Sequence, residues 1–122
     1  MTTLEESFST LFVPAEILEH FKVTKLEEEH GVIIIELYEK EDNSHIPKDI
    51  FKEGKAVLNG YCNKLEIQTY PAQGKEVFLR IYRRKWKVKG TTKSYSNTYE
   101  FTESGMKATK DFGAFLKEIG RG

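Results

Sequence analysis

The sequence has 122 residues, of which 39% are hydrophobic and 31% charged, and these values predict a single globular domain over residues 1–122. No apolar run approaches the ~20 residues of a membrane span, and no basic segment followed by an apolar run opens the chain, so we expect a cytoplasmic protein with no membrane partner. The one cysteine, Cys62, excludes an internal disulfide, in agreement with a reducing compartment.

The N-terminal half predicts short helices followed by a β-hairpin. Two helices are expected, over residues 4–12 and 14–21, because Pro14 ends the first and suits the opening position of the second. Residues 22–40 alternate apolar and polar side chains around Gly31, which can take a positive φ, and this pattern predicts two strands joined by a turn. A polar loop follows, with a helical turn at 47–51 and an irregular path to residue 63.

The C-terminal half predicts an antiparallel meander and a final helix. Three alternating segments are separated by glycine-containing turns: residues 63–71, 75–89 and 93–101. Thr102 can cap a helix over 103–119, whose apolar side chains recur at helical spacing. We expect this helix to pack across the meander, against the face formed by Val77, Leu79 and Ile81. The predicted fold class is therefore α+β, a small antiparallel sheet with short N-terminal helices and a C-terminal packing helix.

Charge is divided unevenly along this chain, whose net charge is zero. Residues 1–60 hold 13 acidic and 6 basic residues, a net of −7, whereas residues 61–122 hold 6 acidic and 13 basic residues, a net of +7. Such asymmetry indicates either that the two halves pair within the fold or that the basic half has a polyanionic partner.

The basic residues concentrate in the long strand over 75–89, where both faces become basic after Ile81. A strand that is basic on both faces is not expected in a core, so the hairpin over 83–93 should project from the body. One interpretation is structural: the basic side chains lie along aromatic rings and protect a sheet edge. The other is that the hairpin binds nucleic acid, with Arg83 and Arg84 in solvent and Trp86 stacking on a base. The residues predicted to bind nucleic acid are Arg80, Tyr82, Arg83, Arg84, Lys85, Trp86, Lys87, Lys89 and Lys93.

Three stretches, "FVPAEILEHFKV", "YPAQGKEVFLRIYRRKWK" and "TKDFGAFLKEI", carry a resemblance over about residues 12–119. Together they resemble the N-terminal region protein of a split insertion-sequence transposase, in which a neighbouring reading frame supplies the catalytic domain. The resemblance implies a non-catalytic DNA-binding accessory domain, with the DNA ends of the element and a separate transposase catalytic subunit as partners.

The middle stretch is also similar to the basic strand of transposases that carry an N-terminal zinc ribbon. At the position of the zinc knuckle this chain has "VKGTTKSY", which contains no cysteine, so we expect folding without zinc. Gly90 and its neighbours would make the turn without a metal.

Catalytic and metal sites are not predicted. The carboxylates cluster in segments typical of solvated strand ends and loops, and His20, His30, His45 and Cys62 lack the spacing of metal ligands. We therefore expect no enzyme activity, no catalytic residue, no cofactor and no metal. The alternative to DNA binding is a protein–protein interaction module that docks on a separate catalytic partner without contacting DNA.

Overall fold

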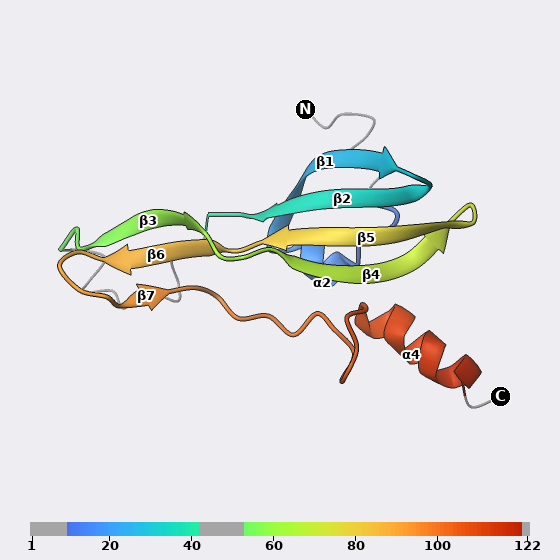
Figure 1. Ribbon diagram of the computed structural model, residues 1–122. Helices are drawn as coiled ribbons and strands as arrows, with labels where there is room; N and C mark the ends of the chain where they lie inside the picture. Colours follow the sequence, from blue (N-terminus) through green and yellow to red (C-terminus); the bar gives the residue numbers. More distant parts are fainter. Residues whose placement is uncertain (1–9, 42–52, 121–122) are drawn as a thin grey trace.

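The computed structural model describes residues 10–41 and 53–120, so the predicted turn at 47–51 and most of the predicted first helix lie outside the described residues (Figure 1). In chain order, the elements are α2 (Ala15–Leu18), β1 (Phe21–Glu29), β2 (Val32–Glu39), β3 (Ala56–Tyr61), β4 (Leu65–Ala72), β5 (Lys75–Tyr82), β6 (Arg84–Val88), β7 (Ser94–Tyr95) and α4 (Lys110–Gly120). The α+β class is confirmed.

A long antiparallel two-stranded ribbon runs through both sheets of the fold. Strands β4 and β5 form its first half around a turn in which Gln73 and Gly74 have φ values of 52° and 78°. Strands β3 and β6 form its second half, and the Cys62 N–H donates to the Arg83 carbonyl oxygen at 2.8 Å where the halves meet. The predicted strand over 75–89 is thus two strands separated by one residue, Arg83.

The first half of the ribbon belongs to a four-stranded sheet, with strand order β1-β2-β5-β4. The predicted hairpin is confirmed, since β1 and β2 pair antiparallel around His30 and Gly31, both with positive φ. The prediction of an antiparallel sheet is wrong for the pairing of this hairpin with the rest of the sheet. Strand β2 lies parallel to β5, from Val32 opposite Glu76 to Tyr38 opposite Tyr82. The alternation that predicts each strand carries no information about its direction relative to a distant neighbour.

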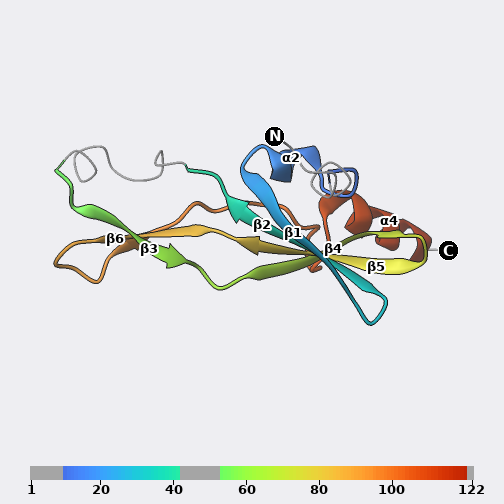
Figure 2. The ribbon, with the colours of Figure 1, turned by 90° about the horizontal axis from the view of Figure 1, so that it is seen from above.

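The second half of the ribbon forms a separate three-stranded sheet, ordered β3-β6-β7. We call this sheet and its turns the basic arm (residues 53–61 and 84–95). It extends beyond the end of the four-stranded sheet, as the predicted projecting hairpin would (Figures 1 and 2). Two predictions are wrong here: β3 was expected to be irregular, and the strand expected over 93–101 is reduced to β7, which pairs with β6.

The core lies on one face of the four-stranded sheet. Val77, Leu79 and Ile81 are at most 1% exposed, which confirms that they face the interior. Helix α2 and the segment after β7 contribute to the core, in place of the predicted C-terminal helix. Ring contacts join Phe21 to Tyr99 and to Phe101, with centroid distances of 5.1 and 5.7 Å. The complete cluster of buried residues is Val13, Ile17, Phe21, Val23, Ile35, Leu37, Ile67, Ala72, Val77, Leu79, Ile81 and Phe101.

Helix α4 lies beside the edge strand β4 and does not cross the sheet. Before it, the Gln68 N–H donates to the Lys107 carbonyl and the Thr109 N–H donates to the Gln68 carbonyl, both at 2.9 Å. These bonds add residues 107–109 to the edge of β4 and prevent a helix from starting at Thr102. Thr109 caps the N-terminus of α4, because its hydroxyl oxygen accepts the Phe112 N–H at 3.4 Å.

Gly113 is the point where α4 passes the turn that precedes it. A Cβ added there would overlap Cβ of Glu103 and lie 3.5 Å from the Met106 sulfur. We expect Gly113→Ala to lower the free energy of unfolding by ~1–3 kcal/mol, because the close packing leaves no room for a methyl group. Gly120→Ala in the same helix is the control, since a Cβ there meets nothing within 4 Å. Equal denaturation midpoints for the two variants would contradict this packing.

Candidate nucleic-acid interface

The buried residues of the ribbon are odd-numbered before Arg83 and even-numbered after it. In β5 the buried residues are odd-numbered, whereas in β6 they are Trp86 and Val88. The prediction carried one strict alternation through the whole run and so placed Lys85 and Lys87 on the same side as Ile81. Within β6, Lys85 and Lys87 alternate with the buried Trp86 and Val88, and so form the less buried side of this strand.

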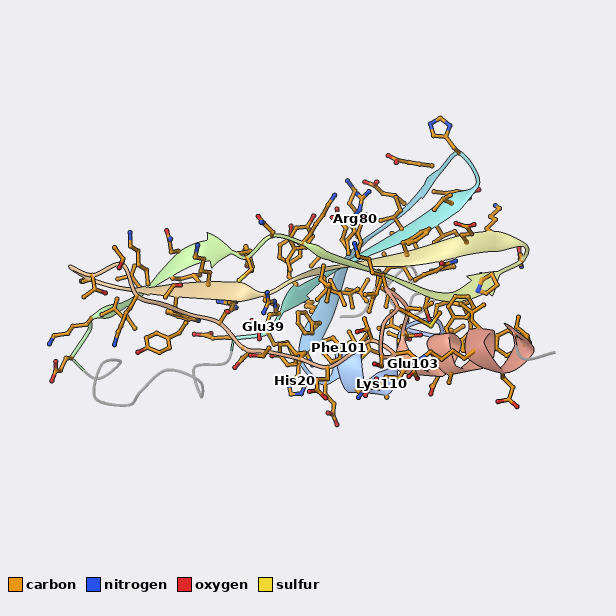
Figure 3. All side chains as sticks on the ribbon, turned by 60° about the horizontal axis from the view of Figure 1, so that its bottom comes forward. His20, Glu39, Arg80, Phe101, Glu103 and Lys110 are labelled. Carbon is orange, nitrogen blue, oxygen red and sulfur yellow. The ribbon has the colours of Figure 1, made fainter. Side chains whose placement is uncertain are left out.

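A buried carboxylate fixes this junction. Glu39, at the end of β2, is 3% exposed and accepts the Arg84 N–H at 2.7 Å and the Asn97 side-chain amide at 2.9 Å. The Tyr99 hydroxyl also donates to Glu39, and the Arg84 Nε donates to the Glu39 carbonyl at 3.2 Å. Figure 3 shows Glu39 where the two sheets meet. The bonds therefore tie β2, β6 and the segment after β7 together.

Arg83 and Arg84 are less exposed than predicted, and Trp86 is not placed to stack on a base as predicted. Arg83 is half-buried, and its Nη1 donates to the Asn97 carbonyl at 3.0 Å. Arg84 is half-buried and bonded to Glu39. Trp86 is 8% exposed, which leaves its ring inaccessible for stacking on a base. These residues hold the arm in place because their partners come from parts of the chain distant in sequence.

Arg80 and Tyr82 lie on the open face of the four-stranded sheet. Figure 3 shows Arg80 on the opposite side of this sheet from the core residue Phe101. The Arg80 Nε donates to Oε1 of Glu66 at 2.8 Å, which lowers the pKa of Glu66 and raises that of Arg80. Both groups are partly exposed, so this pair contributes little to stability. Tyr82 stacks on Tyr38, with centroids 4.5 Å apart and ring planes at 9°.

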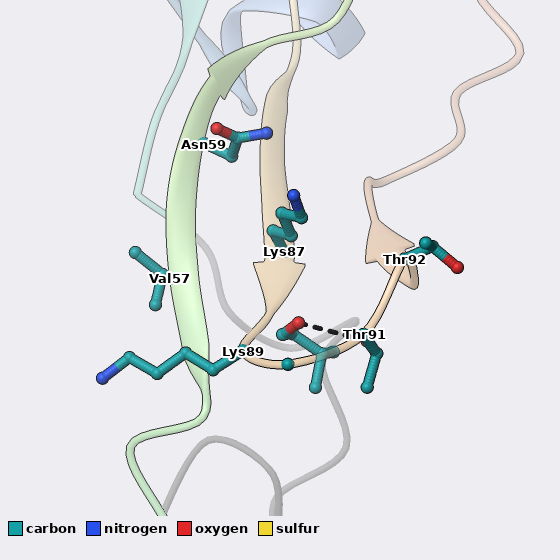
Figure 4. A pocket seen from close by; sticks show the side chains of 8 residues that line it. Val57, Asn59, Lys87, Lys89, Thr91 and Thr92 are labelled. Atoms are coloured by element: carbon teal, nitrogen blue, oxygen red, sulfur yellow. Dashed lines mark hydrogen bonds between the residues drawn. The ribbon is translucent and has the colours of Figure 1, made fainter.

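The remaining predicted residues are the lysines of the arm. Lys87, Lys89 and Lys93 are exposed, and Lys85 is half-buried. Lys87 and Lys89 line an open groove of about 790 Å³ at the end of the arm (Figure 4). The remaining lining residues come from β3 and the turn after β6: Val57, Asn59, Val88, Gly90, Thr91 and Thr92.

Hydrogen bonds within the turn give this groove a fixed shape. Gly90 has a φ of 75°, and the Thr91 hydroxyl donates to the Val88 carbonyl at 3.1 Å. The same hydroxyl accepts the Lys93 N–H at 3.1 Å, and the Val88 N–H donates to the Lys93 carbonyl at 3.1 Å. These bonds fix the path of the turn between Val88 and Lys93.

The arm is the most basic part of the described chain. Its residues 53–61 and 84–95 include six basic residues and one acidic residue, Glu53. Glu53 pairs with Lys55 at 2.6 Å. Strand β3 was not predicted, because its run "AVLNGY" is short and is interrupted by Asn59 and Gly60. The signal available in the sequence was Val57, because β-branched residues favour strands. In the structure Val57 lies opposite Lys87.

Comparison with models of protein families, with curated proteins and with solved structures finds no match to this chain. In the described residues, no three His, Cys, Asp or Glu side chains come together as a candidate metal site. No helix in the same part of the chain has the length and apolar character needed to cross a membrane.

Proposed function

We propose that this protein binds nucleic acid, without catalysis, through the exposed lysines of the basic arm. The observation that carries the proposal is the separation of roles among the basic residues. Arg83 and Arg84 are used inside the protein, whereas Lys85, Lys87 and Lys89 follow one another on the outer side of β6. Lysine ammonium groups attract phosphates at any base sequence, so backbone contacts would dominate the affinity.

The groove at the end of the arm supports this proposal. Lys87 and Lys89 line it, together with the turn residues Gly90, Thr91 and Thr92 (Figure 4). The Thr91 hydroxyl already donates its proton to the Val88 carbonyl, so the ammonium groups of Lys87 and Lys89 are the groups proposed to bind phosphate oxygens here. Because the sequence resembles the N-terminal region protein of a split transposase, we propose that the ligand is DNA at the ends of a mobile element and that the partner is a separate catalytic subunit.

The test is the salt dependence of binding to a labelled duplex of about 20 base pairs, between about 50 and 200 mM salt. If Lys85, Lys87, Lys89 and Lys93 each neutralise one phosphate, the slope of log affinity against log salt should be about −3.5. The triple variant Lys87→Ala/Lys89→Ala/Lys93→Ala should lower the steepness by about 2.5 to 3.

A matched control removes the same charge elsewhere. Lys107, Lys110 and Lys117 are exposed and lie on or next to α4, outside the arm, so their triple alanine variant should keep the wild-type slope. Equal losses in the two triple variants would show that net charge alone determines binding. Absence of binding both to the duplex and to a single strand of the same length, at about 50 mM salt, would refute the proposal.

A second candidate function is docking on the catalytic partner. Phe115 and Ile119 of α4 are 46% and 58% exposed, and an apolar helix side of this kind is favourable for a protein interface. Co-purification with the candidate catalytic subunit, lost in Phe115→Ala/Ile119→Ala but kept in the arm variant, would support docking through α4.

A further inference from the structure

Three tyrosines meet on the outer side of the molecule where the arm joins the four-stranded sheet. Tyr38 of β2 stacks on Tyr82 of β5, and its ring lies 4.9 Å from that of Tyr61 in β3, at 80°. The three rings therefore come from three strands and form one cluster, which we call the tyrosine cluster (Tyr38, Tyr61 and Tyr82).

Packing within the cluster leaves aromatic surface available. Tyr61 is 41% exposed, and Tyr38 and Tyr82 are half-buried. Tyr38 lies between the other two, and burial is the main cause that raises the pKa of its hydroxyl, followed by the neighbouring Tyr82. Tyr38 thus stays neutral and acts as a support, while Tyr61 and Tyr82 present ring surface to solvent.

Both described helices lie on the other side of the four-stranded sheet from Arg80, so neither covers this face (Figure 3). Side chains of β5 alternate, and Phe78, Arg80 and Tyr82 share the open face. Tyr61 belongs to β3, which pairs with β6, and it lies opposite Arg84 at the start of that strand. The tyrosine cluster therefore adjoins the strand that carries Lys85 and Lys87.

We propose that the tyrosine cluster stacks on unpaired bases, and that the ligand of the basic arm is single-stranded nucleic acid. This inference rests on the proposed function and specifies its substrate class. A duplex keeps its bases stacked on one another and offers phosphates alone to such a surface. A single strand offers base faces to Tyr61 and Tyr82 and, along the same backbone, phosphates to Lys85, Lys87 and Lys89.

The sequence preference of this site should be weak. Every base has a π-face, and stacking on tyrosine does not read the hydrogen-bonding edge of the base. Lys22 of β1 lies opposite Tyr38 and carries a single ammonium group that cannot pair with a base edge as a guanidinium can, and Arg80 is already bonded to Glu66 at 2.8 Å, which leaves its guanidinium less available for a base edge. We therefore expect recognition of single-strandedness, with no strong choice among bases.

The experiment compares an oligothymidylate of about 12 nucleotides with a blunt duplex of equal length by fluorescence anisotropy. The wild type should bind the single strand more tightly. Tyr61→Ala/Tyr82→Ala should weaken single-strand binding roughly 10- to 100-fold, as loss of a base–aromatic stack does, and leave duplex affinity and the salt slope unchanged. Tyr61→Phe/Tyr82→Phe keeps the rings and should bind as the wild type does.

Two controls separate binding from folding. Phe115→Ala removes an equally exposed aromatic ring far from the cluster and should have no effect on either ligand. Tyr61→Ala alone removes the most exposed ring, and a thermal melt identical to wild type would show that its binding loss is local.

The outcomes distinguish this inference from the proposed function. Equal affinity of the wild type for the two ligands, or single-strand binding that survives Tyr61→Ala/Tyr82→Ala, would overturn the stacking site while the lysine-dependent slope stands. Absence of binding to either ligand at about 50 mM salt would overturn both.

Discussion

Replacement of Glu39 by alanine should lower the free energy of unfolding by about 3–5 kcal/mol. The carboxylate is 3% exposed and accepts from the Arg84 N–H, the Asn97 amide and the Tyr99 hydroxyl. Its removal takes the carboxylate acceptor away from these three donors, which is the costly way to break a buried polar network. Urea denaturation of wild type and variant measures the loss.

A control on the same strand separates this network from charge alone. Glu36 is half-buried on the opposite face of β2, and Glu36→Ala should cost less than about 1 kcal/mol. Glu39→Gln should give an intermediate loss, because the amide retains one acceptor oxygen and turns an NH₂ group toward the donors. Losses of similar size in Glu39→Ala and Glu36→Ala would mean that the buried network contributes no more than a surface charge.

Replacement of Phe21 by alanine should cost about 3–5 kcal/mol, as other truncations of buried aromatic side chains do. Phe21 is 1% exposed and makes ring contacts with Tyr99 and Phe101. Alanine would leave a cavity between β1 and the segment after β7, and the rings beside it would lose contacts that they cannot replace without moving the chain.

Phe115→Ala serves as the comparison, since its ring is 46% exposed and its loss should cost less than about 1 kcal/mol. Thermal and urea midpoints of the two variants check the difference. A Phe21→Ala variant with a wild-type midpoint would show that the segment after β7 does not seal the core.

Local pattern explains why several elements could be predicted from the sequence. Strands β1, β2, β4 and β5 alternate apolar and polar residues, and glycine at a turn marks the end of each pair. These signals depend on near neighbours in the chain. The parallel pairing of β2 with β5 depends on residues far apart, and no periodicity encodes it. The start of α4 was wrong for a similar reason, because bonds from Gln68 hold residues 107–109 extended.

The candidate site shows the same division. The lysines of the arm were predicted because charge density is visible in the sequence. The sequence did not predict which residues near these lysines are used inside the protein. Arg84 has its partner in Glu39, 45 positions earlier, and Trp86 is buried in the strand that begins after Arg83. The contact between Tyr61 and Tyr38 was not predicted, because the strand of Tyr61 is short and no local pattern connects these two residues.

The continuity of the ribbon has a consequence for the order in which the molecule assembles. The turn at Gln73 and Gly74 closes the shortest loop, and pairs farther along the ribbon join residues ever more distant in sequence, from Leu65 opposite Ile81 to Ala56 opposite Val88. Closing a short loop first makes each later pair less costly in chain entropy, so we expect the ribbon to zip from its turn toward the arm.

Opening should proceed in the reverse direction. The arm is the far end of this zipper, and few of its contacts belong to the main core. We therefore expect it to fray before the four-stranded sheet does, and a partner that grips β3 and β6 together would clamp the end of the ribbon that is first to separate.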